Sequence, residues 1–400
     1  MAATEKGVWD LQEVRDKQLA SEWTYTWGGT LWAWGWNPSG ILGQNNKTRR
    51  SSPTQIGTSA SWSYVGGSGP GYYANGIKSD GTLWGWGGPG KSIGINSNAQ
   101  YSSPIQIGTS TDWKMVSKGG EANTAAIKTD GTMWVWGSNE SGKLGLNIGG
   151  DPAPVQATPL QLGTDTNWKF CSMSKRHALA IKTDGTIWGW GRGNSGGLGL
   201  NNNNQVSSPT QIGTNTNWKT IVSRTYGGAA INTSGQLFSW GYNSVGQVGD
   251  NTQGSHVSSP KQIPGSWAFV DTGGDSMQSV MGLKTNGTMW AWGTASKGQI
   301  DSNLYGNNSG RSSPVQIGTE TTWSTADNEN NGNTGMMQHS ACNAAMKTDG
   351  TWWTWGSNNY GNLGQNDHTG SPNYGVGSPK QLPGSWKFIG VSEQAMWGIK

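Results

Sequence analysis

The side chains best suited to catalysis or metal binding are few in this sequence and do not cluster. Its four histidines have no cysteine or carboxylate at the spacing of a metal site; they are His177, His256, His339 and His368. No Gly-x-Ser-x-Gly nucleophile motif, phosphate-binding Gly-Lys-Ser loop or pair of carboxylates occurs in a convincing context. We therefore expect no catalytic residues, no metal and no cofactor, and a protein that is not an enzyme.

Aromatic residues outside any regular pattern are more suggestive of function. Several tyrosines fall in or near stretches typical of loops; they are Tyr72, Tyr73, Tyr226, Tyr242, Tyr305, Tyr360 and Tyr374. An exposed ring stacks on a sugar or anchors a protein partner, although single exposed aromatics are also ordinary on protein surfaces. We take Tyr72 and Tyr73 as candidate partner-binding residues.

A repeated phrase must supply the elements that position these loops. Gly-Thr-Leu-Trp-Ala-Trp-Gly at Gly29–Gly35 returns in similar form six more times, ending at Gly87, Gly137, Gly191, Gly241, Gly293 and Gly356. The intervals between the final glycines are 52, 50, 54, 50, 52 and 63 residues. A period near fifty is the signature of a propeller or a solenoid.

The phrase has the pattern of a β-strand. Its residues alternate in character, which places both tryptophans on one face of a strand. Asp-Gly or Asn-Gly precedes five of the phrases, as at Asp80-Gly81, and these dipeptides favour a type I′ hairpin turn. Each phrase is therefore predicted to be the second arm of a hairpin whose first arm resembles Ala125-Ala126-Ile127-Lys128. The repeat length accommodates four short strands.

The order of these elements resembles the repeat family named for the regulator of chromosome condensation. The turn, the tryptophan pair, a Gly-x-Leu-Gly corner such as Gly142–Gly145 and a Ser-Ser-Pro-x-Gln stretch recur in that order across nearly all of residues 24–400. The resemblance implies an all-β, seven-bladed β-propeller, and a structural hydrogen bond for His177 in an inner strand. Two copies depart from the pattern, at Phe238 and Asp301, and we expect distortion at the corners of those blades.

The two ends of the chain predict how the ring closes. Residues Trp386 to Lys400 supply the first two strands of a repeat and stop where a turn is due, while Trp27 begins where that turn would end. The closing blade is thus shared by N-terminal and C-terminal strands, which removes the exposed sheet edges. Because neighbouring repeats share one continuous structure, residues 24–400 form one domain. The whole chain is rich in tryptophan (26) and glycine (65).

Charge and cysteine content exclude several classes of protein. A formal net charge of +4 over 400 residues, without runs of Lys and Arg, implies no nucleic-acid partner. Cys171 and Cys342 fall in different repeats, so both are expected to be small buried side chains rather than a disulfide. No basic segment followed by an apolar one opens the chain, and no apolar run is long enough to span a membrane.

Residues 1–23 lie outside the repeat and are predicted to form a short helix that acts as a docking segment. Asp10 and Glu13 fit a capping box, and good helix formers follow. The apolar side chains proposed to contact a partner are Trp9, Leu11, Val14 and Leu19. The stretch Gly7-Val8-Trp9-Asp10-Leu11-Gln12-Glu13-Val14 resembles the N-terminal segment of many virion structural proteins of tailed phages, particularly marine ones. That resemblance implies a component of a virus particle; packing of the helix on its own propeller is the alternative.

The longest copy of the repeat suggests a further contact. Its excess lies in residues 327–339, between the opening strand and the hairpin, and begins as a polar run rich in Asn and Gly. Added loops on a regular scaffold are where partners bind, while a tolerated insertion without function is the alternative. Met336 and Met337, at its end, would offer adaptable apolar contact.

Together these features favour a non-enzymatic phage virion protein. The propeller would decorate the particle, assemble a tail or fibre, or attach to the host surface. Its partners would be other virion proteins, reached through the N-terminal segment, and a host-surface glycan or protein. Two alternatives stay open: a bacterial lectin-like or protein-binding propeller, and guanine nucleotide exchange on a small GTPase, which is an activity of one branch of the family.

Overall fold

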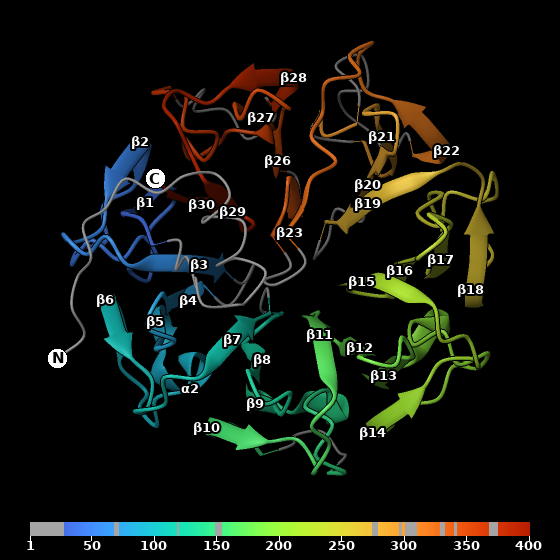
Figure 1. Cartoon of the computed structure of the whole chain (residues 1–400), viewed down its shortest axis with the longest axis horizontal. Coiled ribbons are helices and arrows are strands. Elements are labelled where there is room, and N and C mark those ends of the chain that lie inside the picture. Colours follow the sequence, from blue (N-terminus) through green and yellow to red (C-terminus); the bar gives the residue numbers. More distant parts are fainter. Residues whose placement is uncertain are drawn as a thin grey trace, which may run out of the picture.

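The computed structural model describes residues 28–67, 72–117, 120–148, 154–273, 279–295, 298–300, 310–328, 333–339, 342–367 and 375–400. Seven four-stranded antiparallel sheets are arranged around a centre, each with its first strand inside (Figure 1). The structure confirms the seven-bladed β-propeller. The predicted N-terminal helix and docking residues lie outside the described residues and stay a prediction.

Blades 1 to 7 are numbered along the chain, and the strands of each are given from the inside outward. Blade 1 is β3 (Trp62–Gly67), β4 (Tyr73–Lys78), β5 (Leu83–Pro89) and β6 (Gln100–Gln106). Blade 2 is β7 (Trp113–Val116), β8 (Asn123–Lys128), β9 (Met133–Gly137) and β10 (Gln156–Gln161). Blade 3 is β11 (Trp168–Met173), β12 (His177–Lys182), β13 (Ile187–Gly191) and β14 (Val206–Gln211). Blade 4 is β15 (Trp218–Arg224), β16 (Gly227–Asn232), β17 (Leu237–Gly241) and β18 (Val257–Ile263). Blade 5 is β19 (Trp267–Thr272), β20 (Ser279–Lys284), β21 (Met289–Gly293) and β22 (Arg311–Gln316). Blade 6 is β25 (Met336–His339), β26 (Cys342–Met346), β27 (Trp352–Ser357) and β28 (Gly375–Gln381).

Blade 7 joins the two ends of the chain, as predicted. From the inside outward it contains β29 (Phe388–Val391), β30 (Ala395–Ile399), β1 (Leu31–Gly35) and β2 (Arg50–Gln55). Strands β1 and β30 pair antiparallel over their whole length, from Leu31 opposite Ile399 to Gly35 opposite Ala395. Because this pairing closes the ring, blade 7 has a neighbouring blade on each side like the other six.

The hairpin turns differ from the predicted type I′. Such a turn needs positive φ at both central residues, yet in the Asp80-Gly81 turn only Gly81 has it, at 77°. Gly81 N donates to Lys78 O at 2.9 Å, so residues 79–81 form a type I turn followed by a left-handed glycine. The aspartate instead accepts from Thr82 Oγ1 at 2.6 Å, and that hydroxyl accepts from Trp84 Nε1 at 2.8 Å. The prediction of a hairpin was correct, but the predicted turn type was wrong. The type I′ prediction places the Asp-Gly pair at the centre of the turn, whereas the aspartate is present for the hydrogen bond that its side chain accepts.

A tryptophan–lysine sandwich recurs in six blades. In blade 1 the Lys78 ammonium lies 3.8 Å from the centre of the Trp84 ring and 5.2 Å from that of Trp62. The same arrangement holds Lys128, Lys182, Lys284, Lys347 and Lys400. Blade 4 has Asn232 and Phe238 at the corresponding positions, but its four strands are complete. Phe238 therefore does not distort the blade as expected, and Asp301 lies outside the described residues.

Neighbouring blades are linked through the second tryptophan of the repeated phrase. This side chain is fully buried, and in six blades its Nε1 donates to a backbone carbonyl in the corner of the preceding blade, as Trp190 does to Lys143 O at 3.0 Å. The other five are Trp34, Trp86, Trp240, Trp292 and Trp355. Blade 1 has the short helix α2 (Gly90–Ile93) at its corner, and Trp136 Nε1, which faces it from blade 2, has no acceptor within the described part of the chain.

The insertion of blade 6 interrupts the innermost strand at a site where other blades have a bulge. In blade 3, Trp168 pairs with Lys182 and Phe170 with Ile181, which leaves residue 169 as an extra residue. In blade 6, Trp323 likewise pairs with Lys347, but the strand resumes only at Gly335, whose carbonyl accepts from Met346 N at 2.7 Å. Between them a small hairpin forms from β23 (Asp327–Asn328) and β24 (Asn333–Thr334).

Met336 and Met337 were wrongly predicted as partner contacts. They are the first residues of β25, opposite Ala345 and Ala344, and are 0% and 1% exposed. The prediction failed because the insertion ends before them, so both methionines belong to the inner strand and pack in the core.

The exceptional position of Trp136 gives a direct test of the indole hydrogen bond. Trp190→Phe removes ring volume and also the bond to Lys143 O, whereas Trp136→Phe removes ring volume alone. We expect the first substitution to lower the free energy of unfolding by about 1 kcal/mol more than the second, because a net intramolecular hydrogen bond contributes about that much. Denaturant unfolding of both variants measures the difference, and equal losses would show that the bond contributes nothing.

Candidate binding face

A first cluster of aromatic side chains joins three blades on one face of the ring. The face is the one formed by the loops that connect the first strand of each blade to its second and the third to its fourth. Trp36 of blade 7 stacks on Tyr360 of blade 6, with ring centres 4.9 Å apart and planes at 19°. The edge of Tyr72, from blade 1, meets Trp36 at 5.3 Å. All three rings are half-buried, so each keeps part of its surface available for contact.

A second cluster lies at the equivalent loops of blades 3 and 4. The Arg176 guanidinium lies 4.6 Å from the centre of the Tyr226 ring. Tyr226 contacts Tyr242 at 5.7 Å, and Tyr242 contacts the exposed His256 at 4.9 Å. Tyr226 immediately precedes the second strand of its blade, as Tyr72 does, and Tyr242 follows the third strand, as Trp36 does. The two clusters therefore occupy the same repeat positions on the same face.

A repeated backbone hydrogen bond holds these positions together. The residue after the third strand donates its N–H to the carbonyl of the residue before the second strand. Trp36 N donates to Gln394 O at 2.8 Å, and Tyr242 N donates to Tyr226 O at 2.9 Å. At the corresponding position of blade 1, Gly88, which lies within the longer strand β5, donates its N–H to Tyr72 O at 2.8 Å. Because this bond belongs to the sheet framework, the aromatic side chains project from fixed backbone rather than from long loops.

Below the second cluster a buried arginine fixes the loop that contains Tyr242. Arg224 is 1% exposed, and its guanidinium donates to the carbonyls of Gln247 at 2.7 Å and Trp240 at 2.6 Å. Burial lowers the pKa of Arg224 to about 9, so it remains protonated at neutral pH. A buried charge is expensive to leave without partners; these carbonyls supply them and tie the loop to the blade.

His177 has a structural role of the kind the family resemblance implied. It is 0% exposed, and its Nε2 lies 3.0 Å from Gly227 O. Since a carbonyl only accepts, Nε2 carries the proton. Burial lowers the pKa of His177 to about 4, and the nearby Arg224 and Arg176 charges act in the same direction. The ring is therefore neutral at pH 7 and joins blade 3 to blade 4.

The predicted site residues have mixed outcomes. Tyr72 belongs to the first cluster, but Tyr73 is 1% exposed and its hydroxyl donates to Asn123 O at 2.7 Å, so its assignment as a contact residue was wrong. Adjacent residues along an extended strand point to opposite faces of the sheet, which explains why Tyr73 is buried while Tyr72 is partly exposed. Trp36 and Arg176 were missed. The signal for Trp36 is that most other copies of the phrase are followed there by small or polar residues, such as Gly88 and Ser138, and one other copy is followed by an aromatic residue, Tyr242. Tyr305, Tyr374 and His368 lie outside the described residues.

Other expected features concern cysteines, metals and membranes. Cys171 and Cys342 are both buried free thiols, as predicted, and burial raises the pKa of each to about 12. Across the described residues, no group of three or more His, Cys, Asp or Glu side chains is placed to hold a metal ion. In that same part of the chain no helix has the length and apolar character to cross a membrane.

The sheet order and the repeated corners define a seven-bladed propeller. Residues 184–229 and 234–272 match the model of the regulator of chromosome condensation (RCC1) repeat. The chain is thus a seven-bladed propeller, and this part of it is similar to the RCC1 repeat.

Similar proteins agree with this fold. The Ultraviolet-B receptor UVR8 of Arabidopsis thaliana is 26% identical over 296 residues, which are 72% of this chain and 66% of the receptor, just under two thirds of its length. The crystal structure of human WBSCR16 has a TM-score of 0.76 at 19% identity, over 92% of this chain and 99% of that one. Yeast RCC1 (Prp20), solved bound to Kap60, has a TM-score of 0.74 at 17% identity, over 100% and 94% of the two chains.

The buried histidine predicts a loss of stability in mild acid. The pKa of His177 is about 4 in the folded chain and 6.5 when unperturbed, so between these values the unfolded chain binds a proton that the folded chain does not. The contribution of neutral His177 to the free energy of unfolding is complete above pH 6.5 and is lost as the pH falls to 4. The loss is at most about 3 kcal/mol. His177→Gln keeps a donor for Gly227 O but does not titrate. The free energy of unfolding, measured from pH 7.5 to 4, should therefore fall more steeply for the parent chain than for the variant. Parallel pH dependences of the two chains would show that His177 is not the buried neutral group described here.

Proposed function

We propose that this chain is a protein-binding propeller that acts as a non-enzymatic structural component of a tailed-phage particle. The observation that supports binding most directly is the pair of aromatic clusters on one loop face. Tyr, Trp and Arg dominate the energetics of protein interfaces, and here they are half-buried on rigid backbone. Such side chains lose little conformational freedom when a partner covers them.

Similar propellers support protein binding in general rather than one partner. Yeast RCC1 (Prp20) has been solved bound to Kap60, and a second solved structure, of Prp20p from Saccharomyces cerevisiae, is described together with its binding to Gsp1p and histones. At 17% and 18% identity these likenesses concern the fold alone. We therefore carry over the use of a propeller surface for binding, and none of those partners.

The virion role rests on residues 1–23. Their resemblance to the N-terminal segment of phage virion proteins motivates a division of labour in which that segment docks on another particle protein. The propeller then presents its aromatic face outward, where it decorates the particle or contacts the host surface. Two of the deeply buried ionisable groups, Arg224 and His177, hold loops in place, which fits a scaffold better than an enzyme.

A particle assay tests the virion role. Particles purified from cells that produce the full chain should contain it, and deletion of residues 1–23 should remove it from the particles while the soluble propeller still unfolds cooperatively. The chain's absence from purified particles, or unchanged incorporation of the deleted form, would contradict the proposal.

Substitutions in the first aromatic cluster test the binding face. Trp36→Ala together with Tyr360→Ala should weaken capture of the partner protein by tenfold or more, because truncation of a central aromatic anchor costs about 2 kcal/mol or more. Particle incorporation should persist, since docking is assigned to residues 1–23. Tyr101→Ala, which alters a half-buried tyrosine in the outer strand β6, is the matched control. An equal effect of the control on partner capture would mean that the aromatic face has no special role.

A further inference from the structure

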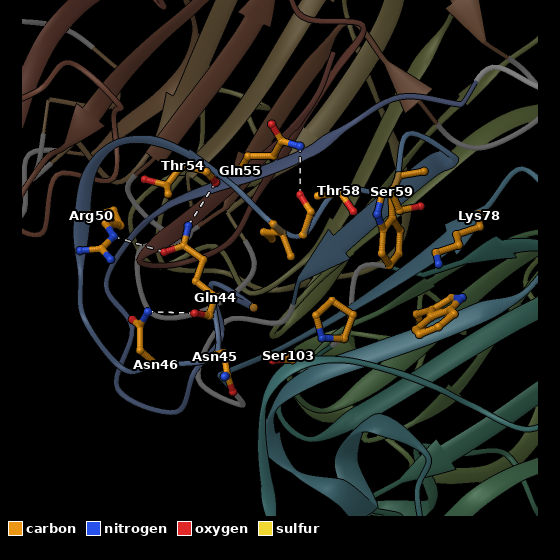
Figure 2. A pocket seen from close by; sticks show the side chains of 16 residues that line it. Gln44, Asn45, Asn46, Arg50, Thr54, Gln55, Thr58, Ser59, Lys78 and Ser103 are labelled. Atoms are coloured by element: carbon orange, nitrogen blue, oxygen red, sulfur yellow. Dashed lines mark hydrogen bonds between the residues drawn. The ribbon is translucent and has the colours of Figure 1, made fainter.

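A second surface lies at the opposite ends of the strands from the aromatic clusters. A groove of about 570 Å³ runs between blades 7 and 1 and is lined by residues of both blades, with Lys78 and Arg50 at its two ends (Figure 2). The lining includes Gln44, Ser59, Trp62 and Trp84. It contains two cationic side chains and no carboxylate.

The positive charge of this region is a property of the sequence around it. Between Glu22 and Asp80 the chain has no acidic residue and four basic ones, which are Lys47, Arg49, Arg50 and Lys78. Those four charges equal the formal net charge of the whole chain, +4. Lys47 and Arg49 are exposed and flank Arg50. Asp80 follows this stretch, and the Thr82 hydrogen bond and, to a lesser extent, the Lys78 charge lower the pKa of its carboxyl, but Asp80 does not line the groove. The groove lining itself therefore has positive charge without a carboxylate.

Comparison of the blades shows how Lys78 differs from two of its counterparts, Lys182 and Lys347. Lys284 and Lys400 resemble Lys78, because Pro264 and Pro383 stand three residues before the first tryptophan of their blades. Lys182 pairs with Asp165 at 2.7 Å and Lys347 pairs with Glu320 at 2.6 Å, and both acids stand three residues before the first tryptophan of their blade. In blade 1 that position is Ser59, which lines the groove. The sandwich between Trp62 and Trp84 thus fixes an ammonium group at the groove, while the carboxylate that would neutralise it is absent from the lining.

Arg50 is also held in place, at the other end. Its Nε donates to Gln44 Oε1 at 3.3 Å, and Gln44 Nε2 donates in turn to Thr54 O at 3.1 Å. These bonds use the Nε edge of the guanidinium, and among the described residues its two terminal nitrogens have no hydrogen bond, so both can face a ligand. Carboxylates and phosphates are the groups that a guanidinium recognises with two parallel hydrogen bonds.

The rest of the lining indicates which kind of anion fits. Amides and hydroxyls, from residues such as Asn45, Thr58 and Ser103, line the groove together with two indole rings. This mixture suits a ligand with many hydroxyls and an apolar ring face, which is a sugar. A nucleic acid instead requires a track of cations along successive phosphates, and the two cations lining this groove stand at its separate ends.

We propose that the groove between blades 7 and 1 binds an acidic oligosaccharide, with carboxylates of its uronic or sialic acid units at Lys78 and Arg50. The site is independent of the proposed protein-binding face, because it lies at the other end of strand β4. It gives the propeller a second kind of ligand, an anionic surface glycan.

Two matched comparisons test the site by titration calorimetry on the full chain. The ligands are an oligogalacturonate, the same oligosaccharide as its methyl ester, and an oligosialic acid. At least one of the two acidic ligands should bind, the methyl ester should bind tenfold or more weakly than its free acid, and affinity should fall as salt rises from about 20 to about 500 mM. Binding of neither acid, or equal binding of the ester and the oligogalacturonate, would overturn the proposal.

Ser59→Asp is the decisive variant. It places in blade 1 the acid that blade 3 has at Asp165, so it should neutralise Lys78 and weaken binding tenfold or more without loss of thermal stability. Ser110→Asp makes the same change at the same position of blade 2, beside Lys128 and away from the groove, and should leave affinity unchanged. Unaltered binding by Ser59→Asp, equal weakening by Ser110→Asp, or tighter binding of an oligoglutamate peptide than of both sugars would reject the acidic-glycan site.

Discussion

The packing of a buried indole against the corner of the preceding blade is the contact on which the ring depends, and at six of the seven junctions a hydrogen bond from the indole completes it. It joins parts of the chain about fifty residues apart, and in blade 7 it joins the ends, because Trp34 donates to Asn362 O at 3.1 Å. The corner must bring its backbone close to the ring. At Gly145 a Cβ would lie 2.9 Å from Trp190 Nε1, and φ is 76°. Glycine is required there for both reasons, which explains why the tryptophan pair and the Gly-x-Leu-Gly corner recur together.

Blade 4 shows that the remaining repeat residues act as one network. In blade 1, Lys78 packs on Trp84, Trp84 donates to Thr82, and Thr82 donates to Asp80. Blade 4 has Asn232, Phe238, Gln236 and Ser234 at these four positions, so every member has changed. Phenylalanine has no N–H to donate and binds a cation less strongly than tryptophan does. Asn232 Nδ2 instead donates to Gln236 Oε1 at 2.8 Å, which restores a local hydrogen bond without the charge.

The regular repeat made the scaffold predictable from sequence, while features that occur once were not. The period, the alternation around each tryptophan pair and the split blade follow from residues that recur seven times. Met336 and Met337 lie beside an insertion, and the sequence does not show on which side of it the strand resumes; the backbone does, because Gly335 accepts from Met346. Tyr72 and Tyr73 are adjacent, and a one-residue shift in where the strand begins reverses which of them is buried. Both errors are errors of register.

The separation of the two surfaces follows from the length of one strand. Tyr72 precedes β4 and Lys78 ends it, so six residue steps of about 3.3 Å place them about 20 Å apart. That distance exceeds the 7–10 Å over which substitutions commonly influence one another. The backbone between them is part of a closed ring in which each blade is linked to its neighbours. A protein on the aromatic face and an anionic glycan in the groove would therefore bind without competing, and the sequence at either end of a blade is free to change while the indole contact at its centre keeps the ring closed.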